Sequence, residues 1–424
     1  MTRMTYFGLV LMTALSAACG GVSGGDPGDN GGTAGAGGGD PGGSGGSGGG
    51  EDHPFDAKDL QLNDVSVLFP LPATNQERDA GMLDVQALLP SAIYDSIGHV
   101  SGRSNVGFIG SGEALYKDLR VVALRIDPCF AALEVPADAG DCENQVRLVV
   151  QEVVDGSTSD AALHLFYSIS RDEVLDLVRS IGGLRQSLAP GVSLGRLQPH
   201  PIMVEQGLTG SMSKGVRDAI LHHASTTNLI RVTRMTESNG PFWNFSGFDI
   251  VDGKTVPMHI PTLPPGDDTK QLFARDFGEP PVPSATPPSG SDDDFMKLAA
   301  PVGAQALSHA QQAALFARLL RVENPAHHSP NTVDCASCHI ATPTTKLVAE
   351  PLLGLSGKDA VDRFEPSSKL LQTADLVATF ENDEPLTNVH AFSYTERRAG
   401  ISQRTVNESA AVVSYLSTQE WGAK

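Results

Sequence analysis

Two cysteines and a histidine lie within five positions of one another in the segment DCASCHIATP, residues 334–343. Cys335, Cys338 and His339 are three and four residues apart, so on a helical turn their side chains project from one face. Such a set can form a redox-active disulfide, supply part of a zinc site, or attach a haem through two thioether bonds. The compartment in which the chain works helps to decide among these chemistries.

The beginning of the chain indicates export. Arg3 precedes an apolar run that ends at Leu15 and is too short to span a bilayer, which takes about 20 residues. This pattern predicts a signal peptide over residues 1–18. Ser-Ala-Ala before Cys19 resembles the lipobox of bacterial lipoproteins, which implies a lipidated cysteine at the new N-terminus.

Residues 19–53 begin with that cysteine and are almost entirely Gly, Ser, Asp and Pro. Such a segment cannot bury enough apolar surface to offset its ordering entropy, so we expect a disordered tether. A flexible chain of this length would hold a folded body on the order of 30 Å from its anchor. The protein is therefore expected to be lipid-anchored in the cell envelope, in the periplasm or at the outer membrane.

The formal net charge is −20 at pH 7. This charge argues against nucleic acid and against anionic membrane surfaces as electrostatic partners, which leaves the lipid anchor as the only membrane contact. A basic redox protein is a compatible partner, and so is a simple role of the charge in solubility.

The chain has five cysteines, and two of them lie outside the anchor and the motif. In an oxidising compartment, Cys129 and Cys142 are predicted to form a disulfide that closes a short loop. A closed loop of about 15 residues contributes roughly 3 kcal/mol by the chain-entropy estimate.

The surroundings of Cys335 favour haem over the other two chemistries. Zinc would need four nitrogen or sulfur ligands, and the sequence has no second closely spaced cysteine pair. A redox C-x-x-C normally opens a helix after a strand, which the preceding residues do not predict. C-x-x-C-H in an exported protein is the attachment signature of c-type haem, and here the chain resembles the cytochrome c family. The resemblance implies one covalent haem c, held by Cys335 and Cys338, with His339 as an iron ligand.

One helix is expected before the motif and one after it. SHAQQAALFARLLRV has a capping box at Ser308 and Gln311, and TVNESAAVVSYLSTQEW is capped by Thr405 and Glu408. They resemble the crossing helices of small cytochromes c. The resemblance implies an all-α, cytochrome c-like domain over residues 296–424, with the VVSYL face against the cofactor.

The second iron ligand departs from the commonest cytochrome c pattern, because no methionine follows Met296. His390 lies where that ligand would fall and is our predicted second ligand. His327, His328 and an open site remain alternatives. Histidine in place of methionine lowers the haem potential.

Residues 54–261 are predicted to form a strand-rich α+β domain, and the proline-rich residues 262–295 a linker. A helix is expected over 170–186, with Ser170 and Glu173 as its capping box. Strands are expected in DVSVLF, RVVALRI, QVRLVVQEVV, ALHLFYSI, NLIRVTRM and KTVPMHI. The adjacent His222 and His223 point about 100° apart on a helix, so we do not expect them to share a metal ion.

The residues and the resemblance together favour electron transfer by a lipid-anchored monohaem protein, with no catalytic residue assigned. Two alternatives stay open. In one, haem relays electrons for an oxidoreductase site within residues 54–261; in the other, the chain is a non-redox binding lipoprotein of the envelope.

Overall fold

The computed structural model describes residues 55–100, 113–129, 143–159, 161–238, 242–275, 283–357, 360, 362–366, 389–419 and 421. Contacts divide the chain into Met1–Gly50 and a compact unit Glu51–Lys424, to which every element below belongs. Within the described residues, no helix is both long and apolar enough to cross a membrane.

The unit is built around a 10-stranded sheet whose paired strands are all antiparallel. The strand order is β1-β2-β3-β5-β6-β7-β9-β10, with β4 paired to β3 and β8 paired to β7. A separate hairpin consists of β11 and β12. The bounds are β1 Ser66–Leu68, β2 Leu119–Asp127, β3 Gln145–Val154, β4 Ser157–Thr158, β5 Ala162–Ser168, β6 Leu229–Ser238, β7 Phe242–Val251, β8 Lys254–Pro257, β9 Lys270–Arg275, β10 Pro283–Thr286, β11 Phe392–Thr395 and β12 Arg398–Ile401.

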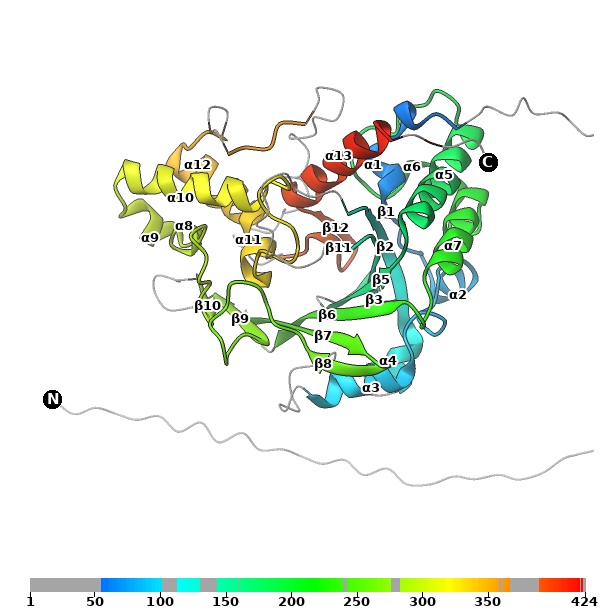
Figure 1. Cartoon of the computed structure of the whole chain (residues 1–424), viewed down its shortest axis with the longest axis horizontal. Coiled ribbons are helices and arrows are strands. Elements are labelled where there is room, and N and C mark those ends of the chain that lie inside the picture. The colour runs from blue at the N-terminus through cyan, green and yellow to red at the C-terminus, as the bar shows by residue number, and fades with distance from the viewer. Residues whose placement is uncertain are drawn as a thin grey trace, which may run out of the picture. The chain divides into compact units, whose positions relative to one another are not determined.

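Helices lie on both sides of this sheet, with α5 and α7 on one side and α8, α10 and α11 on the other (Figure 1). The helix bounds are η1 Ala57–Asp59, α1 Leu62–Val65, α2 Asn75–Gly81, α3 Ser91–Val100, α4 Glu113–Asp118, α5 Arg171–Leu188, α6 Pro201–Gln206, α7 Ser211–His223, α8 Met296–Ala299, α9 Pro301–Gln305, α10 His309–Val322, α11 Cys335–Thr344, η2 Thr345–Ala349, α12 Glu350–Leu353 and α13 Gln403–Ser417.

The first hydrophobic core lies between the sheet and α5 and α7. Strand β5 shows how it forms: Leu163, Leu165 and Tyr167 alternate along the strand and all belong to this core. Val174, Leu177, Val178 and Ile181 of α5 are buried in the same core. The helix expected over 170–186 is therefore confirmed, together with its Ser170 and Glu173 capping box.

The second core lies on the opposite side of the sheet. Side chains of β6, β7 and β9 meet apolar residues of α8, α10 and α11 there; its members include Met235, Trp243, Phe245, Phe273, Phe295, Leu298, Phe316, Leu319, Ala336 and Ile340. The helix expected after Ser308 is confirmed as α10, with the predicted capping box. One sheet thus separates two cores.

All six predicted strand segments contain strand residues, but the sequence reading missed β7, β9 and β10. Strand β7 reads FWNFSGFDIV, and its glycine and polar residues break the apolar run. Gly247 leaves room for the side chain of Met258, which a Cβ at this position would displace.

The predicted fold class is wrong. The C-terminal region is not an all-α cytochrome domain, because it contains the β11–β12 hairpin and shares its core with the large sheet. Residues 262–295 are not only a linker, since they supply β9 and β10 to that sheet. The expectation of a separate all-α domain failed because strands from distant segments of the chain form the layer under these helices. No local sequence pattern indicates that pairing.

Helix α13 also differs from the expectation. It begins at Gln403, with Ser402 as its N-cap, rather than with Thr405 and Glu408 as caps. Its Val412, Val413 and Leu416 belong to the first core, while Cys335 and Cys338 pack against the second. The VVSYL segment thus packs into the first core and does not pack against the C-x-x-C-H motif.

Candidate functional site

The C-x-x-C-H motif lies at the start of helix α11. This start is held by the preceding residue, Asp334, and by Gln271 of the sheet. Asp334 is the N-cap, and its side chain accepts a hydrogen bond from the Ser337 backbone N–H at 3.0 Å. Gln271 of β9 donates to the Asp334 carboxylate at 2.7 Å and accepts from the Ala336 N–H at 2.8 Å. The first turn of α11 is therefore bonded directly to the large sheet.

His339 is oriented by a backbone carbonyl. Its Nδ1 lies 2.6 Å from the carbonyl oxygen of Val389, which can only accept, so Nδ1 carries the proton and donates. The other ring nitrogen, Nε2, is then the one with a free lone pair. This arrangement is the usual way in which a protein prepares a histidine to bind a metal.

The two thiols are free and partly exposed, although the surrounding protein desolvates them. Burial raises the pKa of Cys335, and the nearby Asp334 raises it further; burial likewise raises the pKa of Cys338. A redox-active C-x-x-C needs a lowered thiol pKa. The site therefore does not suit dithiol exchange.

One further histidine approaches the motif from the sheet. His164 of β5 lies with its ring centre 6.3 Å from that of His339, and the two ring planes differ by 35°. It pairs with Val149 of β3 and Thr233 of β6, on the sheet face opposite Leu163 and Leu165.

Both histidines are held neutral. Burial lowers the pKa of His164 to about 3, and His339, Arg125 and Arg147 lower it further. Burial lowers the pKa of His339 to about 4, although its bond to the Val389 carbonyl acts in the opposite direction. A neutral imidazole is the form that binds metals.

These groups lie where α11 faces the sheet, with the rings of His164 and His339 next to each other. His164, Cys335, Cys338 and His339 are all partly exposed, yet desolvation dominates the pKa of each. On the sheet side, the ring of Phe245 lies 5.1 Å from that of His339 and is an apolar neighbour of the motif.

The donor atoms of Cys335, Cys338, His339 and His164 do not converge on one point. Within the described part of the chain, the only group of at least three His, Cys, Asp or Glu ligand atoms close enough to share an ion is Asp176, His222 and His223, with separations up to 4.8 Å. It lies on α5 and α7, on the other side of the sheet. A zinc ion bound by Cys335, Cys338 and His339 together is thus disfavoured. The grouping of His222 and His223 with Asp176 differs from our expectation, because the carboxylate comes from a neighbouring helix.

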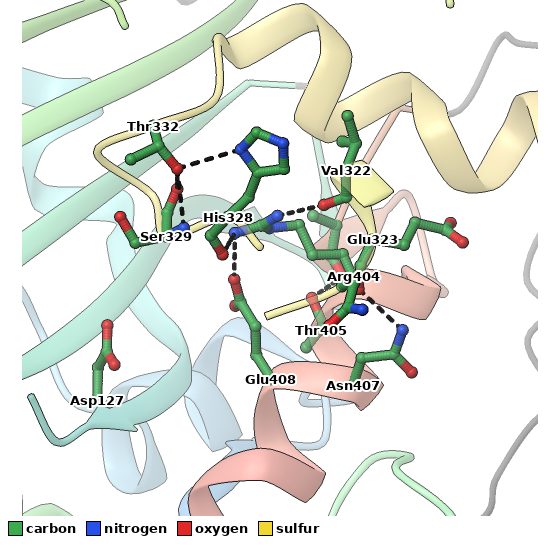
Figure 2. A network of polar contacts seen from close by, with 12 residues as sticks. Asp127, Val322, Glu323, His328, Ser329, Thr332, Arg404, Thr405, Asn407 and Glu408 are labelled. Carbon is green, nitrogen blue, oxygen red and sulfur yellow. Dashed lines mark hydrogen bonds and ion pairs between the residues drawn. The ribbon is translucent and has the colours of Figure 1, made fainter. Parts of the chain in front are cut away.

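A buried polar network joins α13 to the segment before α11 (Figure 2). Arg404 donates to the backbone carbonyls of Val322 and His328, the latter at 3.0 Å, and pairs with Glu408 at 2.7 Å. Glu408 also pairs with Arg125 of β2. Through Glu408, the network ties α13 to β2 of the sheet.

The other histidines predicted as candidates have different surroundings. Both ring nitrogens of His328 are engaged, Nε2 with Asp293 at 2.8 Å and Nδ1 with Thr332 at 3.2 Å. His327 faces Asp362, with Nε2 at 3.6 Å. His390 is 2% exposed, and its Nδ1 hydrogen-bonds Ser393. Its role as second ligand stays a prediction.

Several predicted residues lie outside the described part. The signal peptide, Cys19 and the tether belong to residues 1–53 and are not described. Cys129 is disulfide-bonded, but Cys142 lies outside the described residues, so their pairing stays a prediction.

The sequence reading missed His164. The only available signal was the alternation in ALHLFYSI, which places His164 and Phe166 on one face of a strand and leucines on the other. That pattern shows two distinct faces but does not tell which segment covers the polar one.

No family model matches this chain, and no curated protein or solved structure shows significant similarity to it. The resemblance to cytochromes c therefore depends on the residues of the motif and their setting.

Proposed function

We propose that this chain binds one haem covalently through Cys335 and Cys338 and transfers electrons in the bacterial cell envelope. The observation that carries the proposal is the state of His339: its Nδ1 donates to the Val389 carbonyl at 2.6 Å, which leaves Nε2 for iron. Lipid on Cys19 would anchor the protein, and a basic redox protein is the partner that suits its negative charge.

The residues present fit a haem. Two unbonded thiols and an oriented imidazole lie on the first turns of one helix, beside the apolar ring of Phe245, and their donor atoms do not converge on one ion. Bound there, haem would supply a one-electron iron couple. The chain's own contribution is to hold the iron ligand in one tautomer and to limit the access of water.

The test is expression of the full chain in a host that carries the machinery for c-type haem maturation. We expect the purified protein to have a Soret band and an intact mass that includes one haem. The double variant Cys335→Ala/Cys338→Ala should lose the covalent haem. Ser337→Ala, a buried position between the two cysteines, should keep it. A colourless wild-type protein would reject the proposal.

The same preparation separates electron transfer from a purely structural haem. Reduction by a small donor, followed by stopped-flow absorbance, should be complete and reversible. Haem that cannot be reduced and reoxidised would instead favour a binding role.

A further inference from the structure

The structure points to a second axial ligand from the sheet: we propose that His164 of β5, not His390, binds the iron opposite His339. This inference rests on the proposed function, since it concerns the same haem. It deepens that function, because it makes the large sheet part of the redox centre and not a separate binding domain.

The spacing of the two rings suits one metal ion between them. A metal–nitrogen bond of about 2.0 Å plus about 1.1 Å from the nitrogen to the ring centre places two opposed imidazole centres about 6.2 Å apart. The centres of His164 and His339 are 6.3 Å apart. Ordinary contacts between rings also reach this distance, so the direction and the partners of each ring must decide.

The ring nitrogens of His164 are available to a metal. Within the described part of the chain, they make no hydrogen bond, and the ring contacts that of His339. His164 therefore has no protein hydrogen bond to lose when it binds a metal. His328 differs, because both its nitrogens already have partners.

The direction of His339 argues against His390. On an imidazole ring, the Nδ1–H and the Nε2 lone pair point nearly opposite ways. The Val389 carbonyl accepts from Nδ1, so the backbone of Val389 and of the next residue, His390, lies on the side of His339 away from the iron. His390 also packs its Cβ against Gly400 and bonds to Ser393.

The register of the sheet holds His164 in place. His164 pairs with Val149 and Thr233 in the interior of the sheet, between β3 and β6. Its backbone is therefore bonded on both sides. Helix α11 is tied to the same sheet through Gln271. The distance between the two ligands is thus set by one rigid framework, which limits reorganisation when the iron changes charge.

The test compares the wild type and two variants of the full chain, matured with haem, by absorption and EPR spectroscopy. The wild type should contain low-spin, six-coordinate ferric haem. His164→Ala should become high-spin and should recover the low-spin spectrum when imidazole is added. His390→Ala is the matched control and should stay low-spin.

A third variant covers the case in which His164→Ala fails to fold. His164→Met keeps a side chain of similar size that can bind iron, and methionine in place of histidine should raise the reduction potential. An unchanged potential in this variant would overturn the inference.

Three other results would also count against it. His164 would be excluded as the ligand, with covalent attachment left intact, by any of these results. The haem of His164→Ala could stay low-spin, that of His390→Ala could become high-spin, or that of the wild type could be attached but high-spin. A wild type without covalent haem would reject the proposed function itself, and the inference with it.

Discussion

At the scale of single residues, the site depends on groups whose protonation the fold controls. His339 is held in one tautomer by a carbonyl, and His164 is kept neutral by burial. Glu323 is a third such group. It ends α10, is 2% exposed, and accepts a hydrogen bond from Thr342 of α11 at 2.7 Å.

Burial raises the pKa of Glu323 to about 7, against the opposing effects of Thr342, Lys346 and Arg404, while Glu350 raises it further. The folded state therefore holds this proton more tightly than the unfolded state, where the pKa is about 4.3. The contribution of Glu323 to the free energy of unfolding is therefore most favourable below about pH 4.3. It becomes less favourable as the pH rises toward 7, because the unfolded state then binds fewer protons than the native state.

We predict that Glu323→Gln increases the free energy of unfolding at pH 8, by up to about 3 kcal/mol, and has little effect near pH 4. Urea unfolding at several pH values measures this difference. Glu205→Gln is the control, because Glu205 of α6 is exposed and is not among the groups that shift the pKa of Glu323. An equal gain from Glu323→Gln at both pH values would show that the carboxyl is not desolvated as described.

At the scale of elements, capping decides where helices begin, and the sequence reports it well when the capping box is clear. Helices α5 and α10 begin where Ser170 and Ser308 predict. Helix α13 was misread because Thr405 and Glu408 imitate a capping box, whereas Ser402 accepts from the Thr405 N–H at 3.2 Å. Glu408 instead pairs with Arg404 and Arg125.

We predict that Ser170→Ala lowers the free energy of unfolding by about 1 kcal/mol, because the Glu173 N–H at the start of α5 loses its acceptor. Denaturant unfolding followed by circular dichroism measures the change. Ser187→Ala, exposed in the last turn of the same helix, should change stability by less than about 0.5 kcal/mol. Equal effects of the two variants would mean that the cap contributes nothing.

At the scale of the whole molecule, the motif-bearing helices and the sheet form one structure. Met235, Trp243, Phe245 and Phe273 of the sheet complete the core on which α11 packs. Helices α8 to α13 without this layer would expose a large apolar surface to water.

A fragment of residues 296–424 is therefore predicted not to fold on its own. Expressed alone, it should lack a cooperative thermal transition and should be cut rapidly by protease. A chain that starts at Glu51 is the control and should unfold at the same temperature as the full chain, since the compact unit begins there. A stable, protease-resistant fragment 296–424 would restore the view of two independent domains.

The sequence by itself determined what is local. Spacing along one helix placed Cys335, Cys338 and His339 on the same face, alternation predicted the strands, and caps predicted α5 and α10, because each depends only on neighbouring residues. Only the tertiary structure decided what faces the motif. It joined β7, β9 and β10 into a sheet beneath α11, brought His164 to His339 from a strand far away along the chain, and put the Val389 carbonyl at the Nδ1 of His339. Such contacts depend on the order and register of distant strands, and the free energy that selects them comes from burying a shared core, which no short segment of sequence encodes.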